Sequence, residues 1–427
     1  MTLSADLWDR SLWYATAQEP APETDAPADA RVLVVGGGFT GLSCALHLAE
    51  RGVAVTVIEA REIGFGASGR NGGQVIPGLK IDPSDMRAHW GAKAGGRLAE
   101  FAGGVADQVF GLIERHGIAC APTRAGWIQG AHSAMQLRAV HARAREWQAE
   151  GAPVALLDAV QMAEATGAVG YAGGWRDERA GMLNPLSYAR GLARAARAAG
   201  ATIVTGSPVT GVVRDGAGWR VDLGGQCLRG ETVVLATNAY DSTLRPQLAR
   251  SVLPVQSCVI ATEPLPPEIA ASILPQDACA SEVRKIAVYY RKTPDGRLAF
   301  GGRGATGAAH SQPLQAGLEA QMHRMFPQLD GVRIDKAWSG HLALSRDHLP
   351  HIHQIEPGLW AALAYNGRGV AMATGIGAAL AARLAEGTPL PLPETPLRPI
   401  AWHALRRPAM ELGIRYYLAK DRLGLPS

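Results

Sequence analysis

The chain contains 427 residues, of which 47% are hydrophobic and 19% are charged, and its formal net charge is +4. This length and composition predict a globular protein with two domains and argue against a disordered chain. The basic residues are spread singly among alanines, as at Arg194 and Arg197, which is typical of solvated helix faces and not of a nucleic-acid-binding surface.

Cysteine usage and the N-terminus indicate the compartment. The five cysteines contain no C-x-x-C pair and lie far apart, at Cys44, Cys120, Cys227, Cys258 and Cys279. An odd number of isolated cysteines indicates structural thiols in a reducing environment. The first residues lack the basic and apolar regions of a signal peptide, and no run approaches about 18 apolar residues. We therefore expect a cytoplasmic protein without a membrane span.

Residues 1–30 predict an N-terminal arm and a linker. Two short segments, Leu7 with Trp8 and Trp13 with Tyr14, are apolar and aromatic enough to pack on the rest of the protein. Residues 18–30 are rich in Pro, Ala, Asp and Glu, which is typical of an extended connector.

Residues 31–42 predict a buried strand that runs into a glycine-rich turn and a helix. Gly36, Gly38 and Gly41 occupy the glycine positions of G-x-G-x-x-G, where they permit a tight turn, a close approach of pyrophosphate, and close helix packing. A second buried strand over 53–58 ends in Glu59. An acid at this position accepts hydrogen bonds from the hydroxyl groups of an adenosine ribose. The pattern predicts a dinucleotide site; the alternative is an ordinary βαβ turn.

A second glycine-rich segment, G-F-G-A-S-G-R-N-G-G-Q over residues 64–74, offers almost no side chains to fill a core. Such a backbone is suited to lie against a flat or charged group, and the alternative is a flexible loop. The segment resembles the second signature of the flavin-dependent amine and amino acid oxidases, the family around glycine oxidase, sarcosine oxidase and D-amino acid dehydrogenase. Within that family, residues 59–74, the turn at 365–371, the tail at 416–424 and the aromatic arm at 13–15 are most similar to the γ-glutamylputrescine oxidase branch.

The resemblance implies an α/β fold, in which a Rossmann-like FAD-binding domain of the glutathione-reductase type is interleaved with an α+β substrate domain built on an antiparallel sheet. The FAD-binding domain is expected at 31–82, 151–250 and 331–390. The substrate domain is expected at 83–150 and 251–330, and a C-terminal extension at 391–427. A hairpin signal, T-P-D-G at 293–296, agrees with the antiparallel sheet.

The resemblance also implies the residues that hold FAD. The pyrophosphate and adenosine would contact the first loop, the acid and a later backbone segment: Gly36, Gly38, Phe39, Thr40, Gly41, Glu59, Ala60, Arg61, Val209 and Ala236. Ser68 and Arg70 would face the ribityl and pyrophosphate part, and the ring would lie against Asn71, Gly72, Gly73 and Gln74. FAD is expected to be non-covalent, because the position of the covalent cysteine of sarcosine oxidases falls near Gly340.

Residues 360–384 repeat the pattern of strand, glycine-rich turn and helix. The resemblance implies that this helix points at the pyrimidine edge of the flavin, with contacts from Gly367, Arg368, Gly369 and Val370. The N–H groups and partial positive charge of its N-terminus would stabilise the anionic reduced ring. The alternative is a buried helix with a glycine at its entry. The family's A-T-G turn has Asn238 in place of glycine, and asparagine tolerates a positive φ.

The substrate class follows from one position. Family members that act on α-amino acids carry an arginine that binds the carboxylate, and here Leu342 stands at that position. We therefore expect a primary or secondary amine without an adjacent carboxylate. The resemblance implies hydride transfer to flavin N5 and an imine that hydrolyses to aldehyde and ammonia, with O2 reduced to H2O2.

His341 and Tyr290 are the candidate catalytic residues on the substrate side, with His341 as acceptor of the ammonium proton; for each the alternative is ordinary packing. His348, His351 and His353 show H-x-x-H-x-H spacing, but strand alternation separates them, so we expect no metal.

Two other functions stay open: a dehydrogenase of an amino or imino acid that passes electrons to a carrier, and a non-catalytic flavoprotein subunit. The sequence does not indicate an oligomeric state.

Overall fold

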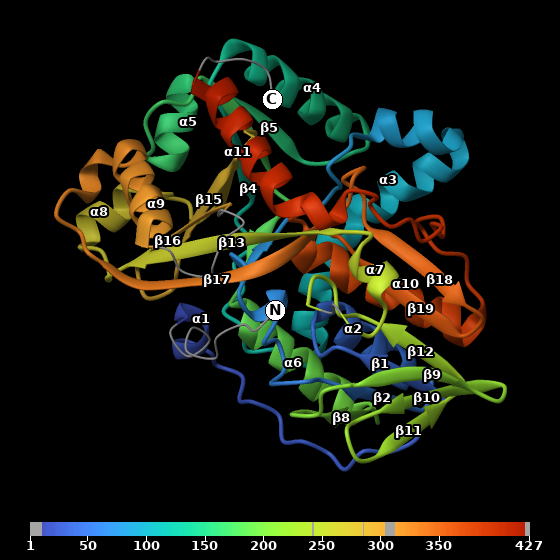
Figure 1. Ribbon diagram of the computed structural model, residues 1–427. Helices are drawn as coiled ribbons and strands as arrows, with labels where there is room; N and C mark the ends of the chain where they lie inside the picture. Colours follow the sequence, from blue (N-terminus) through green and yellow to red (C-terminus); the bar gives the residue numbers. More distant parts are fainter. Residues whose placement is uncertain (1–10, 241–242, 285, 304–311, 423–427) are drawn as a thin grey trace.

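The computed structural model describes residues 11–240, 243–284, 286–303 and 312–422 (Figure 1). Leu7 and Trp8 of the expected arm, and residues 423–427 of the expected extension, lie outside the described residues. The fold combines two large sheets, confirming the predicted α/β class with an antiparallel second sheet.

The first sheet has six strands in the order β18-β19-β12-β1-β2-β8. All neighbouring pairs are parallel except β18 with β19. Its strands are β1 (Val32–Val35), β2 (Val55–Ile58), β8 (Thr202–Val204), β12 (Thr232–Leu235), β18 (His351–Glu356) and β19 (Leu359–Leu363). Both β1 and β2 are buried along their whole length, as expected for parallel strands that are covered on both faces.

Alternate residues of β1 pack into two hydrophobic cores, one on each face of this sheet. Val32 and Val34 join the core that includes the helices α2 (Phe39–Ala49), α6 (Pro185–Ala198) and α10 (Gly369–Glu386). Leu33 and Val35 join a second core with a small three-stranded sheet on the opposite face. That small sheet consists of β9 (Gly211–Asp215), β10 (Gly218–Asp222) and β11 (Cys227–Gly230).

The second large sheet has eight strands in the order β17-β13-β16-β15-β14-β4-β6-β5. Every neighbouring pair is antiparallel except β14 with β4, and β15 and β16 form the predicted hairpin. Its strands are β4 (Trp127–Ala131), β5 (Val154–Asp158), β6 (Gly173–Asp177), β13 (Leu253–Thr262), β14 (Cys279–Glu282), β15 (Val288–Lys292), β16 (Leu298–Arg303) and β17 (Ile334–Leu344).

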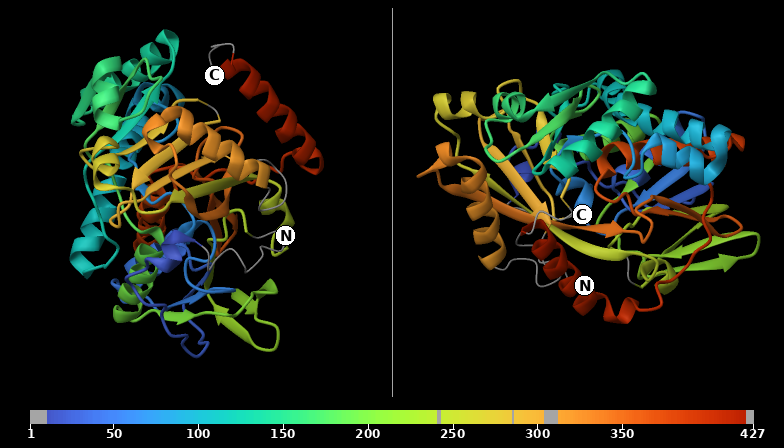
Figure 2. Two further views of the ribbon diagram at one scale, coloured as in Figure 1. Left: turned by 90° about the vertical axis from the view of Figure 1, so that its left-hand side faces the viewer. Right: turned by 90° about the horizontal axis from the view of Figure 1, so that it is seen from above.

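The remaining elements cover or connect the two sheets. The longest helix, α3, ends at Gly117, whose φ of 54° gives a left-handed cap. The other elements are α1 (Leu12–Ala15), η2 (Ala67–Gly69), β3 (Gln74–Val75), α3 (Pro83–His116), α4 (Ala134–Ala149), α5 (Ala159–Thr166), β7 (Gly181–Met182), α7 (Pro246–Ala249), α8 (Pro267–Ser272), α9 (Gln312–Met325), η3 (Pro327–Leu329), η4 (His403–Leu405) and α11 (Arg406–Arg422). Figure 2 shows α11 projecting away from the two sheets.

Two segments that are expected in the FAD-binding domain contain strands that pair with the antiparallel sheet. β5 and β6 belong to the antiparallel sheet, although 151–250 was expected in the FAD-binding domain. β17 also belongs to that sheet, along β13, although 331–390 was expected in the FAD-binding domain. The reason is that each pairing is decided by contacts distant in sequence, which the local pattern of a strand does not contain. The division of the rest of the chain into domains stays a prediction.

The N-terminal arm packs as expected. In α1, Leu12 and Trp13 are buried in a small core with Leu186, Val259 and Trp338, so the arm joins α6 to the antiparallel sheet. The indole Nε1 of Trp13 donates a hydrogen bond to the carbonyl oxygen of Asn71 at 2.7 Å. The arm therefore supports the second glycine-rich loop directly.

Candidate active site

A cavity of about 600 Å³ lies where the two large sheets meet, a size typical of ligand sites. It begins at the carboxyl ends of β1 and β2 and reaches β17 of the antiparallel sheet. Most of the predicted cofactor-binding residues line it: Gly36, Gly38, Phe39, Thr40, Glu59, Ala60, Arg61, Ser68, Arg70, Asn71, Gly72, Gln74, Val209, Ala236, Gly367, Gly369 and Val370.

The first glycine loop leaves no room for side chains. Gly36 has a φ of 115°, and a Cβ there would lie 2.8 Å from the carbonyl oxygen of Ala236. A Cβ on Gly38 would lie 2.8 Å from Ser68 Oγ, which accepts a hydrogen bond from the Phe39 amide at 3.0 Å. The bare backbone and the N-terminus of α2 together form a cradle suited to a pyrophosphate.

Glu59 follows the end of β2 at the same edge of the sheet. Its carboxylate accepts hydrogen bonds from the amides of Gly37 at 2.7 Å and Arg61 at 2.9 Å. Burial raises the pKa of the Glu59 carboxyl, and these backbone hydrogen bonds oppose the rise. The carboxylate is therefore fixed beside the first loop, where the sequence predicts the adenosine ribose.

The second loop is held in shape by its own asparagine. The Asn71 side chain donates to the carbonyl oxygens of Ala67 at 3.1 Å and Ser68 at 2.8 Å, and accepts from the amide of Gly73 at 2.8 Å. Gln74 Nε2 donates to the carbonyl oxygen of Ala280 at 3.0 Å, which links the loop to the antiparallel sheet. The loop is thus an ordered wall of the cavity and not the flexible alternative.

The turn before α10 forms the third wall. The Tyr365 hydroxyl and Thr40 Oγ1 are hydrogen-bonded at 2.5 Å, which joins this turn to the start of α2. Asn366 has a φ of 52°, and its Oδ1 accepts from the amide of Ser345 at 3.1 Å. Asn238, at the end of β12, has the positive φ of 49° that the sequence predicted, and its Oδ1 accepts from the Ala364 amide.

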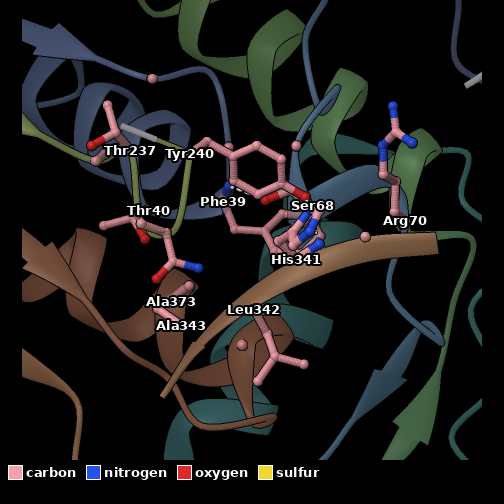
Figure 3. Close-up of a pocket in the computed structure, with 18 of the residues that line it drawn as sticks. Phe39, Thr40, Ser68, Arg70, Thr237, Tyr240, His341, Leu342, Ala343 and Ala373 are labelled. Atoms are coloured by element: carbon pink, nitrogen blue, oxygen red, sulfur yellow. Dashed lines mark hydrogen bonds between the residues drawn. The ribbon is translucent and has the colours of Figure 1, made fainter. Parts of the chain in front are cut away.

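His341, the candidate base, lies in the cavity wall on β17 (Figure 3). Its backbone amide donates to the Tyr240 hydroxyl at 3.0 Å, and the two rings meet edge to face at a centroid distance of 6.1 Å. Burial, and to a smaller extent the positive charge of Arg70, lower the pKa of His341. The imidazole is therefore neutral at physiological pH and is able to accept a proton.

Tyr290 does not line the cavity, so its predicted place on the substrate side is wrong. Its hydroxyl is 3.2 Å from that of Tyr171, and its ring packs against Phe300 and Phe326 in the core of the antiparallel sheet. Successive side chains of a strand point to opposite faces, so it is the neighbour Tyr289 that faces the cavity. The Tyr289 and Ser257 hydroxyls are hydrogen-bonded at 2.9 Å.

Three other predicted residues lie behind the wall. Gly41 packs α2 against the first loop, since a Cβ there would lie 2.1 Å from the carbonyl oxygen of Gly36. Gly73 faces the carbonyl oxygen of Leu183. The Arg368 side chain donates to the carbonyl oxygen of Pro77 and stacks on the Trp127 ring, so only its neighbours in the turn line the cavity.

Sequence reasoning missed several residues that line the cavity. Tyr240, Ser257 and Tyr365 carry hydroxyl groups there, but they lie in different elements and share no spacing. Of these residues, only Tyr289 could have been found from the sequence. Side chains alternate along a strand, so if Tyr290 does not face the cavity, its neighbour Tyr289 is the other choice.

The histidines at 348–353 have separate contacts. His351 Nε2 pairs with the Asp347 carboxylate at 3.0 Å, and His353 Nδ1 is 2.6 Å from the carbonyl oxygen of Thr395. Within the described residues, no group of three His, Cys, Asp or Glu side chains is placed to hold a metal ion.

No helix in the described part of the chain is long and apolar enough to span a membrane.

Comparison with known proteins agrees with this geometry. A family model described as FAD dependent oxidoreductase matches residues 31–383. The chain belongs to this family of FAD-dependent oxidoreductases. It is 33% identical to the γ-glutamylputrescine oxidoreductase of Escherichia coli (strain K12) over 97% of this chain and 99% of that protein. It is 25% identical to the glycine oxidase of Geobacillus kaustophilus, over 79% of this chain and 88% of that protein.

The solved structures agree on the fold. The crystal structure of glycine oxidase from Geobacillus kaustophilus superposes with a TM-score of 0.72 and 23% identity, over 88% of this chain and 99% of that chain. The protein is therefore an oxidoreductase of amine or amino donors with FAD as its cofactor. The cavity fits that cofactor, because its walls have no side chains at Gly36 and Gly38 and a fixed carboxylate at Glu59.

Proposed function

We propose that this protein oxidises a primary or secondary amine that has no carboxylate next to the reacting carbon. The observation that supports this most directly is Leu342, an apolar side chain in the cavity wall where a carboxylate-binding arginine is expected in amino acid oxidases. Arg70 also lines the cavity, but it donates to the carbonyl oxygens of Phe65 and Ser339 and points away from His341 (Figure 3).

The relative of 33% identity is named for γ-glutamylputrescine, a substrate with a terminal amine far from its carboxylate. That name supports an amine of this type as the substrate.

The chain's own residues would prepare the amine for oxidation, while bound FAD supplies the hydride acceptor. His341, neutral because burial and Arg70 lower its pKa, would accept the ammonium proton and leave a neutral amine. Leu342, Ala343 and the Tyr289 ring would exclude water and hold the α carbon in place. We further propose that the imine hydrolyses to aldehyde and ammonia, or to aldehyde and a primary amine where the substrate is a secondary amine, and that O2 is the final acceptor and gives H2O2.

We propose that FAD is held without a covalent bond. All five cysteines lie in the described part of the chain, and none is among the residues that line the cavity. Acid precipitation should therefore leave the yellow colour in the supernatant. Yellow colour in the pellet would contradict this proposal.

The substrate proposal is tested by mixing the holoenzyme anaerobically with single amines and following the flavin absorbance. We expect γ-glutamylputrescine or an alkyl diamine to reduce the flavin faster than glycine or D-alanine does. Leu342→Arg should shift this preference toward the amino acids, because a guanidinium binds carboxylate, while Leu342→Met should not. Faster reduction by glycine or D-alanine in the unchanged enzyme would contradict the proposal. Peroxide formed in equal amount to aldehyde would support O2 as acceptor over a separate electron carrier.

A further inference from the structure

Arg291 lies directly behind the part of the cavity where the flavin ring is expected. On β15 it is two residues from Tyr289, so both side chains lie on the same face of the strand, and Tyr289 lines the cavity. The guanidinium Nη1 is 2.6 Å from the point that a Cβ on Gly73 would occupy. Gly72 and Gln74, on either side of Gly73, both line the cavity. The guanidinium therefore lies against the backbone of the loop at a position between two residues that line the cavity.

The Arg291 charge is almost completely removed from water, at 2% exposure. Its Nη1 donates to the carbonyl oxygen of Leu183 at 2.6 Å, its Nε donates to that of Lys292 at 3.1 Å, and the guanidinium stacks on the Trp13 ring. Besides burial, the groups that act on the pKa of Arg291 are the thiols of Cys279 and Cys120. Burial raises the pKa of each thiol to about 12, so neither carries a compensating charge at neutral pH.

No carboxylate in the described part of the chain forms an ion pair with this guanidinium. Among the described residues, arginines such as Arg179 and Arg194 form ion pairs with Asp or Glu side chains, whereas Arg291 forms none. Burial lowers the pKa of Arg291 to about 10, which leaves it protonated at physiological pH. A buried charge without an ion-pair partner is costly, and a well-packed apolar side chain would avoid this cost. Its field, in a medium of low dielectric constant, extends to the cavity with little screening.

We propose that Arg291 supplies a fixed positive charge that stabilises negative charge on the bound flavin ring, and so makes the flavin easier to reduce. The charge acts through the loop at 71–74 without touching the ring. It would add to the partial positive charge of the α10 N-terminus, whose Gly369 and Val370 line the same cavity. Arg291 is thus assigned to tuning of the cofactor, a role separate from substrate recognition.

The test uses purified holoenzyme and does not need a substrate. The midpoint potential of the flavin and the dissociation constant for sulfite, an anion whose addition to flavins places negative charge on the ring, would be measured in three variants. Arg291→Met and Arg291→Gln remove the charge, whereas Arg291→Lys keeps it. Arg190→Met is the control for loss of a buried arginine away from the cavity, since Arg190 is also buried but its guanidinium stacks on Tyr14 and lies 3.7 Å from the carboxylate of Glu62.

For Arg291→Met and Arg291→Gln we expect the sulfite dissociation constant to rise about tenfold. We also expect a tenfold shift of the two-electron reduction equilibrium, which makes the midpoint potential about 30 mV more negative. Arg291→Lys and Arg190→Met should remain close to the unchanged enzyme. Both neutral variants could instead lose FAD while Arg291→Lys keeps FAD at an unchanged potential. That result would also support the requirement for a positive charge.

Two results would overturn the proposal. One is an unchanged potential and sulfite affinity in a neutral variant that retains FAD. The other is loss of FAD from all three variants, lysine included, which would assign Arg291 to packing of the loop. Neither result depends on which amine the enzyme oxidises, so the proposed function is not affected by this test.

Discussion

At the scale of single residues, His341 and Tyr290 show how much one position on a strand matters. Both were candidates for the substrate side, and both lie on strands of the antiparallel sheet. His341 lines the cavity, whereas Tyr290 points into the core on the opposite face. The same alternation directs Tyr289 and Arg291 toward the cavity, so a shift of one residue exchanges a core side chain for a site side chain.

For His341, we expect His341→Ala to slow flavin reduction by about 10²-fold or more and to remove the acidic limb of its pH dependence. The reason is that the unchanged enzyme loses its proton acceptor as the pH falls through the lowered pKa of His341. Stopped-flow reduction rates between pH 5.5 and 9 measure this effect. A variant that keeps both the rate and the pH profile would remove the assignment of His341 as base.

At the scale of elements, three loops form much of the cavity wall, and the N-terminal arm supports one of them. The first loop, the loop at 64–74 and the turn before α10 come from distant parts of the chain and meet around one cavity. Each joins a strand to a helix or to a short strand, so its backbone is fixed at both ends. The arm adds the Trp13 indole, which donates to Asn71 in the second loop.

Replacement of Gly36 by alanine should weaken FAD binding by at least about tenfold, which is about 1.4 kcal/mol. The methyl group would lie 2.8 Å from the carbonyl oxygen of Ala236, and a φ of 115° is unfavourable for alanine. Gly111→Ala in α3 is the control, because nothing lies within 4 Å of the added Cβ and alanine favours a helix. Titration of apoprotein with FAD measures both. Equal affinities would contradict the role of the first loop.

The arm is tested by Trp13→Ala, which we expect to destabilise the protein by about 3–5 kcal/mol because it empties a buried site. FAD should also dissociate faster, since Asn71 loses the hydrogen bond from the indole. Tyr14→Ala, at a side chain that is 36% exposed, should have a much smaller effect. Thermal unfolding and FAD fluorescence measure the two effects. An unchanged rate of FAD release in Trp13→Ala would show that the arm does not support the loop.

At the scale of the whole molecule, the two large sheets are joined by a common core, which includes Val34 of the first sheet and Trp127 of the antiparallel sheet. The cavity is lined from both sheets, α1 packs between α6 and the antiparallel sheet, and Gln74 bonds across to β14. Bound FAD would contact both halves, so its binding energy also holds them together.

Stability should fall when the pH is lowered from 7.5 to 5.5. Burial lowers the pKa of His47, His341 and His353, so below about 6.5 the unfolded chain binds more protons than the folded one. Their contribution is complete above about 6.5 and is lost as the pH falls through the folded pKa values, by at most about 1.4 kcal/mol per histidine and pH unit. Thermal unfolding of the holoenzyme across this range measures the slope. His353→Gln should reduce it, and an unchanged slope would contradict this account.

The sequence by itself determined the features that depend on local spacing. Gly36, Gly38 and Gly41, the acid at Glu59, the hairpin of β15 and β16, and the positive φ of Asn238 are all readable from neighbours in the chain. The resemblance to flavin oxidases also rested on such short motifs, and the family match over 31–383 confirms it.

Only the tertiary structure decided which strands share a sheet and which side chains share a cavity. β5, β6 and β17 pair with partners far away in sequence, and pairing energy arises only after the chain has folded back on itself. The faces of Tyr289, Tyr290 and Arg291 depend in the same way on what covers each side of β15. Local patterns therefore identify the backbone that cradles the cofactor, whereas the groups that face the cavity are chosen by packing.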